Sequence, residues 1–164
     1  MAAEFELTDE MRSAIGKESD PYPVEFTTTG IRAFARGVGY KDPVYYNVDA
    51  AKAAGYASLP APPSYMGIPV FDPAVVDFTY GQPIKTNAPR VHHGLPNLLD
   101  GGTEVTYVRV PVAGETLFFT SKVAGLEVKE SKGLGKMLLI SNVQTFRDDD
   151  GATVFTVSGQ AIYY

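Results

Sequence analysis

The stretch GKMLLISNVQTFRDDDGATVFTVSGQAIYY, residues 135–164, decides the fold class. Two runs rich in Val, Ile, Phe and Thr flank the dipeptide Asp150-Gly151. Asp-Gly between two apolar runs is a strong signal for a β-hairpin, because these residues accept the backbone angles of a tight turn. We therefore predict that residues 135–146 and 152–164 form two antiparallel strands, and that Asp148 to Asp150 form a solvated turn.

The strand pattern begins further upstream, near Asp100. The runs TEVTYVRVPV (residues 103–112) and ETLFFTSKVAGLEVKES (residues 115–131) are rich in Val, Thr, Tyr and Phe, and a turn with Pro and Gly separates them. Such residues favour strands bounded by turns. We predict four successive strands joined by short turns, an antiparallel meander, with Gly125 and Gly159 at bulges or at points of close backbone approach.

The first half of the chain is predicted to be mainly helical. Thr8 caps a helix over residues 8–15, because its side chain can accept from the free N–H groups of the first turn. YPVEFT (residues 22–27) forms a short strand, and NVDAAKAAG (residues 47–55) forms a small helix that ends at Gly55.

The segment GIRAFARGV, residues 30–38, has the clearest helical spacing. Thr28 or Thr29 is its predicted N-cap. Its apolar residues follow the i, i+3, i+4, i+7 spacing of one buried face: Ile31, Phe34, Ala35 and Val38. Pro62 or Pro63 begins a further helix, since a proline in the first turn loses no hydrogen bond.

Residues 72–99 show no hydrophobic period, and a loop of that length in a compact domain is usually functional or mobile. The chain has no internal repeat and no linker, so we predict one domain over residues 1–164, with residues 1–21 as an N-terminal extension. Helical segments followed by a run of strands favour the α+β class, with an antiparallel sheet wrapped around a central helix.

Composition excludes several classes of function. The 164 residues carry 14 Lys and Arg against 19 Asp and Glu, a net charge of −5, without a basic cluster that would bind nucleic acid. There is no cysteine, hence no disulfide framework and no thiolate zinc site. The start MAAEFELTDE lacks the basic and apolar regions of a secretory signal, and no window approaches the ~18 apolar residues of a membrane span. We expect a cytoplasmic protein without membrane or nucleic-acid partners.

Four segments, in the same order along the chain, are similar to one protein family. FARGVGYKDPVYYN (residues 34–47) resembles the signature F-A-x-x-S/T-G-D-x-N-P-x-H of the MaoC-like hydratases and dehydratases. Three later segments resemble that family's N-terminal-type branch, which is similar to the dehydratase of fatty-acid synthase: AAGYASLPAPPSY (53–65), LLDGGTEVTYVRVPVAGETL (98–117) and DDDGATVFTVSGQAIYY (148–164). The similarity covers about residues 22–164.

The resemblance implies a hot-dog fold, in which an antiparallel sheet curls around a long helix and two such units dimerise. It implies a hydro-lyase that reversibly adds water across a trans-2-enoyl thioester of CoA or acyl carrier protein, giving a (3R)-hydroxyacyl thioester in fatty-acid or polyketide metabolism. It implies no metal and no redox cofactor. Such a reaction needs a general base, an acid for the α-carbon, and donors for the thioester oxygen.

The residues that carry proton transfer in the family are replaced in this chain. Tyr40 stands at the position of the signature's Asp, and Tyr45 at that of its His. A tyrosine with a pKa of about 10 is a poor base at neutral pH, so the segment is not expected to catalyse in the family's usual way. Asp42 is either a displaced base or a turn residue before Pro43.

His93, next to His92, is either a proton-transfer group near neutral pH or a polar loop residue, and neither histidine has the spaced partners of a metal site. Asp42, Tyr45 and His93 are therefore the candidate catalytic residues. Tyr40, Tyr45 and Tyr46 either line an acyl-thioester pocket or pack as core or interface aromatics.

The remaining candidates are substrate-binding residues. Pro62, Pro63 and Ser64 match the stretch that opens the family's central helix, where Ser64 either donates to a carbonyl or caps the helix. Gly101 and Gly102 either allow close approach of the substrate or form a bulge where a strand begins.

The leading hypothesis is that this chain is a subunit of an enoyl-thioester hydratase or (3R)-hydroxyacyl dehydratase. It would lack the Asp/His pair and supply scaffold and acyl tunnel to a catalytic MaoC-like partner. One alternative is a self-sufficient enzyme that uses Asp42 or His93. The other is a non-catalytic module that binds an acyl thioester or a small aromatic ligand. A single hot-dog unit exposes a sheet edge, so we expect a homodimer or a heteromer.

Overall fold

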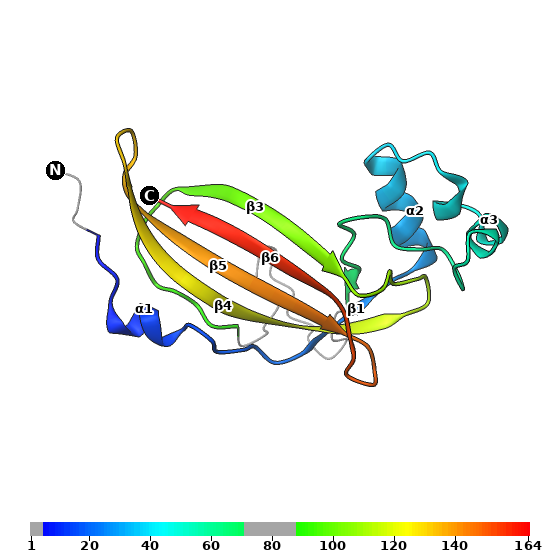
Figure 1. The fold of residues 1–164 in the computed structure, drawn as a ribbon, viewed down its shortest axis with the longest axis horizontal. Helices are drawn as coiled ribbons and strands as arrows, with labels where there is room; N and C mark the ends of the chain where they lie inside the picture. Colours follow the sequence, from blue (N-terminus) through cyan, green and yellow to red (C-terminus); the bar gives the residue numbers. More distant parts are fainter. Residues whose placement is uncertain (1–4, 71–87) are drawn as a thin grey trace, which may run out of the picture.

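A computed structural model describes residues 5–70 and 88–164. Its body is a six-stranded antiparallel sheet with strand order β2-β1-β4-β5-β6-β3 (Figure 1). The strands are β1 (Tyr22–Glu25), β2 (Ile68–Pro69), β3 (Leu98–Tyr107), β4 (Thr116–Ser131), β5 (Gly135–Arg147) and β6 (Thr153–Tyr163). The predicted α+β class and antiparallel sheet are confirmed. Residues 71–87, and with them most of the loop predicted over residues 72–99, lie outside the described residues.

The predicted hairpin is formed by β5 and β6. Arg147 pairs with Thr153, and Gly151 in the turn between them has a φ of 79°. Asp148 stabilises this turn, because its Oδ1 atom accepts from the backbone N of Ala152 at 2.9 Å. Asp-Gly was predicted to form this turn because it accepts a positive φ, and the structure shows that conformation at Gly151.

The predicted meander is wrong in its first connection. β3 was expected to pair with β4, but it pairs with β6 and stands at the edge of the sheet. The reason is that residues 108–115 cross the end of the sheet. Hydrogen bonds from Arg109 N to Val154 O and from Phe26 N to Glu115 O fix this crossing. β4 then begins beside β1 instead of returning along β3.

The helices are α1 (Asp9–Ser13), α2 (Thr28–Gly37) and α3 (Val48–Ala53), with the short 3₁₀ helix η1 (Pro43–Tyr45) between the last two. Thr8 caps α1 as predicted, although the helix ends at Ser13 and does not reach Ile15. The prediction that Thr28 or Thr29 caps α2 is wrong. Thr27 has the extended backbone of a cap, and its side chain accepts from Gly30 N at 3.0 Å.

No helix begins at Pro62 or Pro63, contrary to the prediction. The carbonyl of Pro62 accepts from Tyr65 N at 3.0 Å, which closes a single turn. Ser64 within that turn has a φ of 64°, in the left-handed region. A residue in that conformation cannot continue a right-handed helix, so the chain leaves the turn and enters β2.

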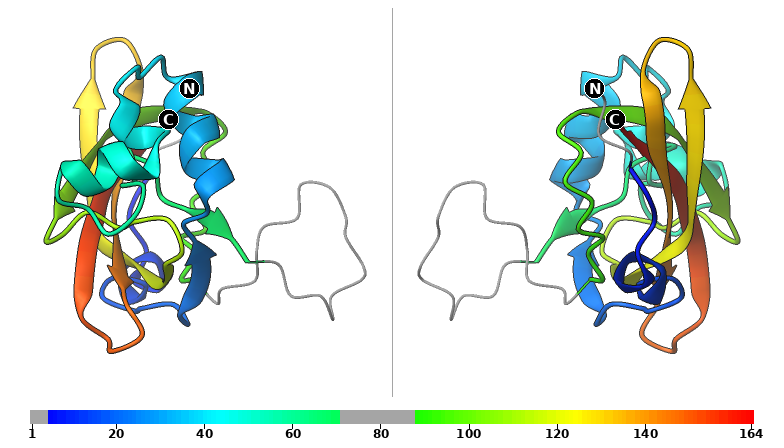
Figure 2. Two further views of the ribbon diagram at one scale, coloured as in Figure 1. Left: turned by 90° about the vertical axis from the view of Figure 1, so that its right-hand side faces the viewer. Right: turned by 90° about the vertical axis from the view of Figure 1, so that its left-hand side faces the viewer.

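The sheet has an inner face, defined as the face that carries Phe146 and Phe155. Near α2 this face packs against a large apolar cluster that includes Ile31 and Leu59. At the other end, Leu138 and Ile140 form a second cluster together with residues from the N-terminal segment and from residues 88–97: Ala14, Phe5, Leu7, Val91 and Leu95. Figure 2 shows α1 and α2 on the same side of the long strands.

The N-terminal extension also completes the sheet beside β4. Gly16 N donates to Val123 O at 2.9 Å, and Ser19 N donates to Ser121 O at 2.8 Å. The Glu18 carboxylate accepts from the Thr120 hydroxyl and lies 3.6 Å from the Arg147 guanidinium. These contacts cover an edge of β4 that would otherwise present unpaired backbone groups.

No helix in the described part of the chain is long and apolar enough to cross a membrane.

Candidate active site

Tyr40 and Tyr45 lie side by side in the lobe formed by α2, η1 and α3, which we call the helical lobe. Their ring centroids are 5.7 Å apart and their planes are inclined by 26°. Gly39, with a φ of 80°, turns the chain after α2, and Tyr40 N then donates to Ala35 O at 2.9 Å. The Tyr46 hydroxyl fixes this turn by donating to Tyr40 O at 2.6 Å. The two positions that matched the family's Asp and His are thus adjacent in space and occupied by stacked phenols.

The surroundings of Tyr45 favour the protonated form of its hydroxyl. Burial raises the pKa of Tyr45 above its ordinary value, and the nearby charge of Asp42 raises it further. The phenol therefore stays protonated at neutral pH. It can donate a hydrogen bond to a carbonyl oxygen, but it cannot take a proton from water.

Asp42 has a local structural role in this geometry. Its Oδ1 atom accepts from Val44 N at 3.0 Å, which caps η1. The residue is exposed and immediately precedes Pro43, as the turn interpretation predicts. This contact occupies one carboxylate oxygen with a backbone N–H group.

Ser64 lies beside the end of β3 and is not a helix cap. Its backbone N donates to the Tyr107 hydroxyl oxygen at 3.0 Å, and its own hydroxyl donates to Pro63 O at 2.6 Å. Tyr107 also contributes to the raised pKa of Tyr45. Tyr45, Ser64 and Tyr107 therefore belong to one neighbourhood at the helical lobe.

The sequence analysis did not identify Tyr107 or Tyr65 as site residues. Tyr65 packs between Phe34 and Phe26, with ring centroids 5.2 and 5.6 Å away. Its hydroxyl is buried without a hydrogen-bond partner in the described part of the chain, and burial raises its pKa. The signal that could have identified Tyr65 is its place directly after the Pro62 to Ser64 motif. Tyr107 gives no comparable local signal.

His93 is anchored at the far end of the inner face. Its ring centroid lies 4.0 Å from that of Tyr163, and its Nδ1 atom accepts from Leu95 N at 3.1 Å. The neutral form consequently carries its proton on Nε2. Burial lowers the pKa of His93, and the neighbouring His92 lowers it further. The imidazole is therefore held neutral at neutral pH.

The lowered pKa of His93 predicts a pH dependence of stability. The unfolded chain, with a histidine pKa of about 6.5, binds the proton more readily than the folded chain, so lowering the pH favours unfolding. The stabilisation that comes from neutral His93 is complete above about pH 7. It is lost as the pH falls through roughly 6.5 and then through the lowered pKa of the folded state.

His93→Asn retains an acceptor for Leu95 N without a titrating ring, so we expect it to flatten the stability curve over this range. Urea unfolding followed by circular dichroism at several pH values would measure the effect. If the free energy of unfolding of the variant depends on pH as steeply as that of the unchanged protein, the pH dependence does not come from His93.

Gly101 and Gly102 form a bulge in β3, where the register with β6 shifts between Asp100 and Thr103. Gly102 has a φ of 108°, and a Cβ at Gly101 would lie 2.9 Å from the backbone O of Gln160. Glycine is required at both positions by the backbone itself. The bulge borders a shallow hollow of about 490 Å³ whose lining includes Gly102 and Thr103.

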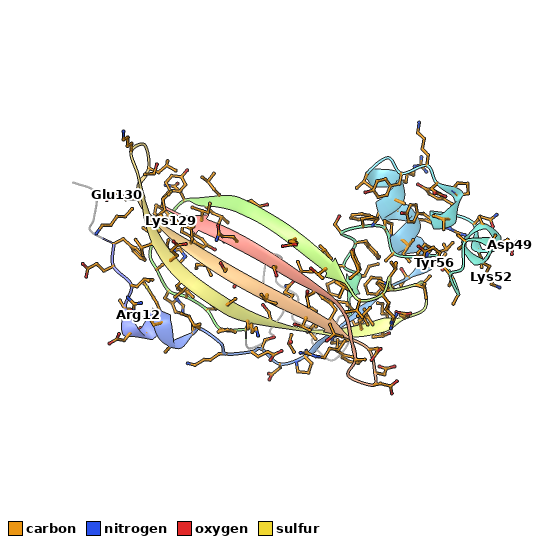
Figure 3. The ribbon with its side chains drawn as sticks, in the orientation of Figure 1. Arg12, Asp49, Lys52, Tyr56, Lys129 and Glu130 are labelled. Atoms are coloured by element: carbon orange, nitrogen blue, oxygen red, sulfur yellow. The ribbon has the colours of Figure 1, made fainter. Side chains whose placement is uncertain are left out.

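The candidate residues fall into two separate groups. Ser64 and Tyr45 lie at the Tyr107 end of β3, whereas His93 stacks on Tyr163, which pairs with Leu98 at the other end. A strand from residue 98 to residue 107 spans about 30 Å at about 3.3 Å per residue. In Figure 3, Asp49, Lys52 and Tyr56 mark the helical lobe, and Lys129 and Glu130 lie at the opposite end of the molecule. Asp42 and His93 of one chain therefore cannot act together as an acid–base pair.

Comparison with protein families and curated sequences gives a consistent result. Residues 13–157 match the model of the FAS1-like dehydratase domain region. A UPF0336 protein of Streptomyces avermitilis is 32% identical over 117 residues, which are 71% of this chain and 73% of that protein. A UPF0336 protein of a Parafrankia species is 30% identical over 128 residues, covering 73% of this chain and 72% of that protein.

Solved structures with the same fold are more distant in sequence. A chain of the ChsH1-ChsH2 complex from Mycobacterium tuberculosis superposes with a TM-score of 0.74 at 16% identity, covering 96% of this chain and 97% of that chain. A chain of the HadBC (3R-hydroxyacyl-ACP dehydratase) complex from the same organism gives 0.67 at 16% identity over 91% and 96%. A MaoC-like dehydratase from Rhodospirillum rubrum gives 0.59 at 18% identity over 92% of each chain.

Proposed function

Since the chain belongs to the FAS1-like dehydratase family and has the hot-dog fold of MaoC-like dehydratases, we propose that it is the non-catalytic subunit of a heteromeric enzyme. The enzyme would be an enoyl-thioester hydratase or a (3R)-hydroxyacyl-thioester dehydratase. A MaoC-like partner with an intact Asp and His would transfer the protons, and this chain would supply scaffold and part of the acyl-binding surface.

The observation that carries the proposal is the stacked pair of Tyr40 and Tyr45. Addition of water to an enoyl thioester needs a base that takes a proton from water and an acid that gives one to the α-carbon. The raised pKa of Tyr45 keeps its phenol protonated, and neither member of the pair is a carboxylate or an imidazole that could take the proton. Tyr45 can still donate to a thioester oxygen, which is a binding and orienting role.

Two further observations support a partner chain. Two of the structurally similar proteins are described as complexes of named components, ChsH1-ChsH2 and HadBC. In addition, β3 is a long edge strand on which Leu98 and Leu99 are 59% and 44% exposed. Exposed apolar residues on a free strand edge favour association with another chain.

The test is an enoyl-thioester hydration assay, followed by loss of the conjugated-thioester absorbance. The purified chain alone is expected to show no turnover above background with short or long enoyl-CoA substrates. Mixed with a MaoC-like subunit that retains the Asp/His pair, it is expected to raise turnover above that of the subunit alone. General acid–base catalysis contributes about 10²–10⁴-fold, so the turnover of the purified chain alone and that of the mixture should differ clearly.

Turnover by the chain alone at ordinary enzymatic rates would overturn the non-catalytic assignment. The alternative of relocated chemistry would then be tested with Asp42→Asn and His93→Asn. Asparagine keeps the caps that both side chains provide to backbone N–H groups, so a loss of activity without a loss of stability would identify the base.

A further inference from the structure

β3 forms one edge of the sheet, and β6 is the strand that pairs with it in the described part of the chain (Figure 1). Eight of its ten residues are exposed. A long edge strand that is open to solvent presents a row of unpaired backbone N–H and C=O groups. The chemistry of this edge therefore indicates what kind of chain can cover it.

The backbone groups of β3 that point away from β6 follow from the hydrogen bond at the end of the strand. Val108 N donates to Val154 O at 2.9 Å. Hydrogen-bonded and non-hydrogen-bonded residues alternate along an antiparallel ladder, so the backbone groups of Thr103, Val105 and Tyr107 point outward. These outward groups make no backbone hydrogen bond to a described residue beyond β6. They are free to pair with an added strand.

The other end of β3 is apolar on both faces of the sheet. Leu98 and Leu99 are 59% and 44% exposed. Leu98 faces Tyr163, which belongs to the second apolar cluster on the inner face, so Leu99 lies on the outer face. A helix packed on one face would cover only one of the two leucines. A strand added beside β3 contacts both, so we take the occupant of this edge to be a strand.

The charge of the edge distinguishes a second copy of this chain from a different chain. Asp100 and Glu104 are the charged residues of β3, and β6 has none. Neither carboxylate forms an ion pair with a described residue. If two copies pair with Val105 facing Val105, the two Glu104 side chains lie on a diagonal, about 7–8 Å apart. If the register moves by one residue, they face each other at about 5 Å. Like charges at such positions oppose pairing.

We infer that β3 pairs with an edge strand of a different chain that carries Lys or Arg opposite Glu104. The inference rests on the proposed function and names the surface on which the catalytic subunit would bind. The facing strand extends the sheet, covers Leu98 and Leu99, and neutralises the acidic centre of the edge. Exchanging a like-charge pair for an opposite-charge pair across two strands changes affinity by about 2- to 30-fold.

The test uses the variant Glu104→Lys as the basic partner. Sedimentation velocity at low ionic strength compares the unchanged chain, the variant, and an equimolar mixture of the two. Each chain alone is expected to be mainly monomeric at a concentration at which the mixture forms a dimer, because only the mixture places Lys opposite or diagonal to Glu104. Added salt should weaken the mixed dimer, since exposed charges are screened.

Val105→Pro tests whether the backbone of β3 makes the contact. Its N–H points away from β6, so proline at this position removes no hydrogen bond within the sheet but blocks pairing with an added strand. The variant is expected to keep its circular dichroism spectrum and to lose association with the Glu104→Lys chain. The matched control is Glu10→Lys, which makes the same change of charge at an exposed position on α1 and should not produce a mixed dimer.

Three results would overturn the inference: dimerisation of the unchanged chain as tight as that of the mixture, no association in the mixture, or a mixed dimer that survives Val105→Pro. All three leave the proposed function standing if the unchanged chain still raises the turnover of a catalytic subunit, because that subunit would then bind at another surface. Association at β3 without a gain in turnover would contradict the proposed function instead.

Discussion

Replacement of Phe155 by alanine is expected to lower the free energy of unfolding by about 3–5 kcal/mol. Phe155 is fully buried, and its ring contacts Phe146, Tyr107 and Phe26, with centroids 4.1, 5.5 and 6.3 Å away. The substitution therefore removes the transfer energy of a whole ring and also leaves a cavity. Phe146 and Tyr107 cannot collapse into it, because each is fixed on its own strand by the register of the sheet.

The loss of packing at Phe155 should also affect the helical lobe. Tyr107 packs on Phe155, and its hydroxyl accepts from Ser64 N. When Phe155 is truncated, Tyr107 loses its support, and the turn that carries Ser64 loses an anchor. We therefore expect the backbone amide signals around Ser64 to shift in the nuclear magnetic resonance spectrum of the variant.

Urea unfolding at fixed protein concentration, followed by circular dichroism, measures the change in stability; the chain has no tryptophan to report it. Phe155→Leu is the control, since it keeps most of the volume and should cost no more than about 1.5 kcal/mol. If alanine costs no more than leucine, Phe155 and the two rings beside it, Phe146 and Tyr107, do not pack as a rigid unit.

The parts of the fold that were predictable from sequence are those whose cause is local. Asp150-Gly151 specifies its own turn, and Thr8 specifies its own cap. The position of β3 is different, because the Val- and Thr-rich run predicts a strand without indicating which neighbour it pairs with. That choice depends on the crossing of residues 108–115, which backbone hydrogen bonds to Phe26 and Val154 fix.

The same distinction applies to the candidate site. Tyr40 and Tyr45 were recognised because a short signature places them, and they are in contact. The roles of Tyr107 and Tyr65 depend on residues far away in sequence, since Tyr107 bonds Ser64 and Tyr65 packs on Phe34. The separation of His93 from Asp42 also depends on the tertiary structure. It is set by the length of a strand that lies between them, and neither sequence motif indicates it.

Gly30→Ala is expected to destabilise the protein by about 1–3 kcal/mol, although alanine usually stabilises a helix relative to glycine. A methyl group at this position would overlap the Tyr65 hydroxyl and lie 2.9 Å from Cδ1 of Ile68. Ile68 is 41% exposed and can move away. Tyr65 is buried between Phe26 and Phe34, so its rigid ring cannot.

Tyr65→Phe removes the overlapping atom and therefore separates this cause from a general effect on α2. Since the Tyr65 hydroxyl is buried without a partner among the described residues, its removal alone is expected to stabilise the protein by about 1 kcal/mol. In the double variant the methyl group has room and the helix gains the normal preference for alanine. The two changes should thus be non-additive by at least about 1 kcal/mol in urea unfolding, with the double variant more stable than Gly30→Ala. Additive effects would mean that Gly30 is needed for the backbone of α2 itself and not for the approach of Tyr65.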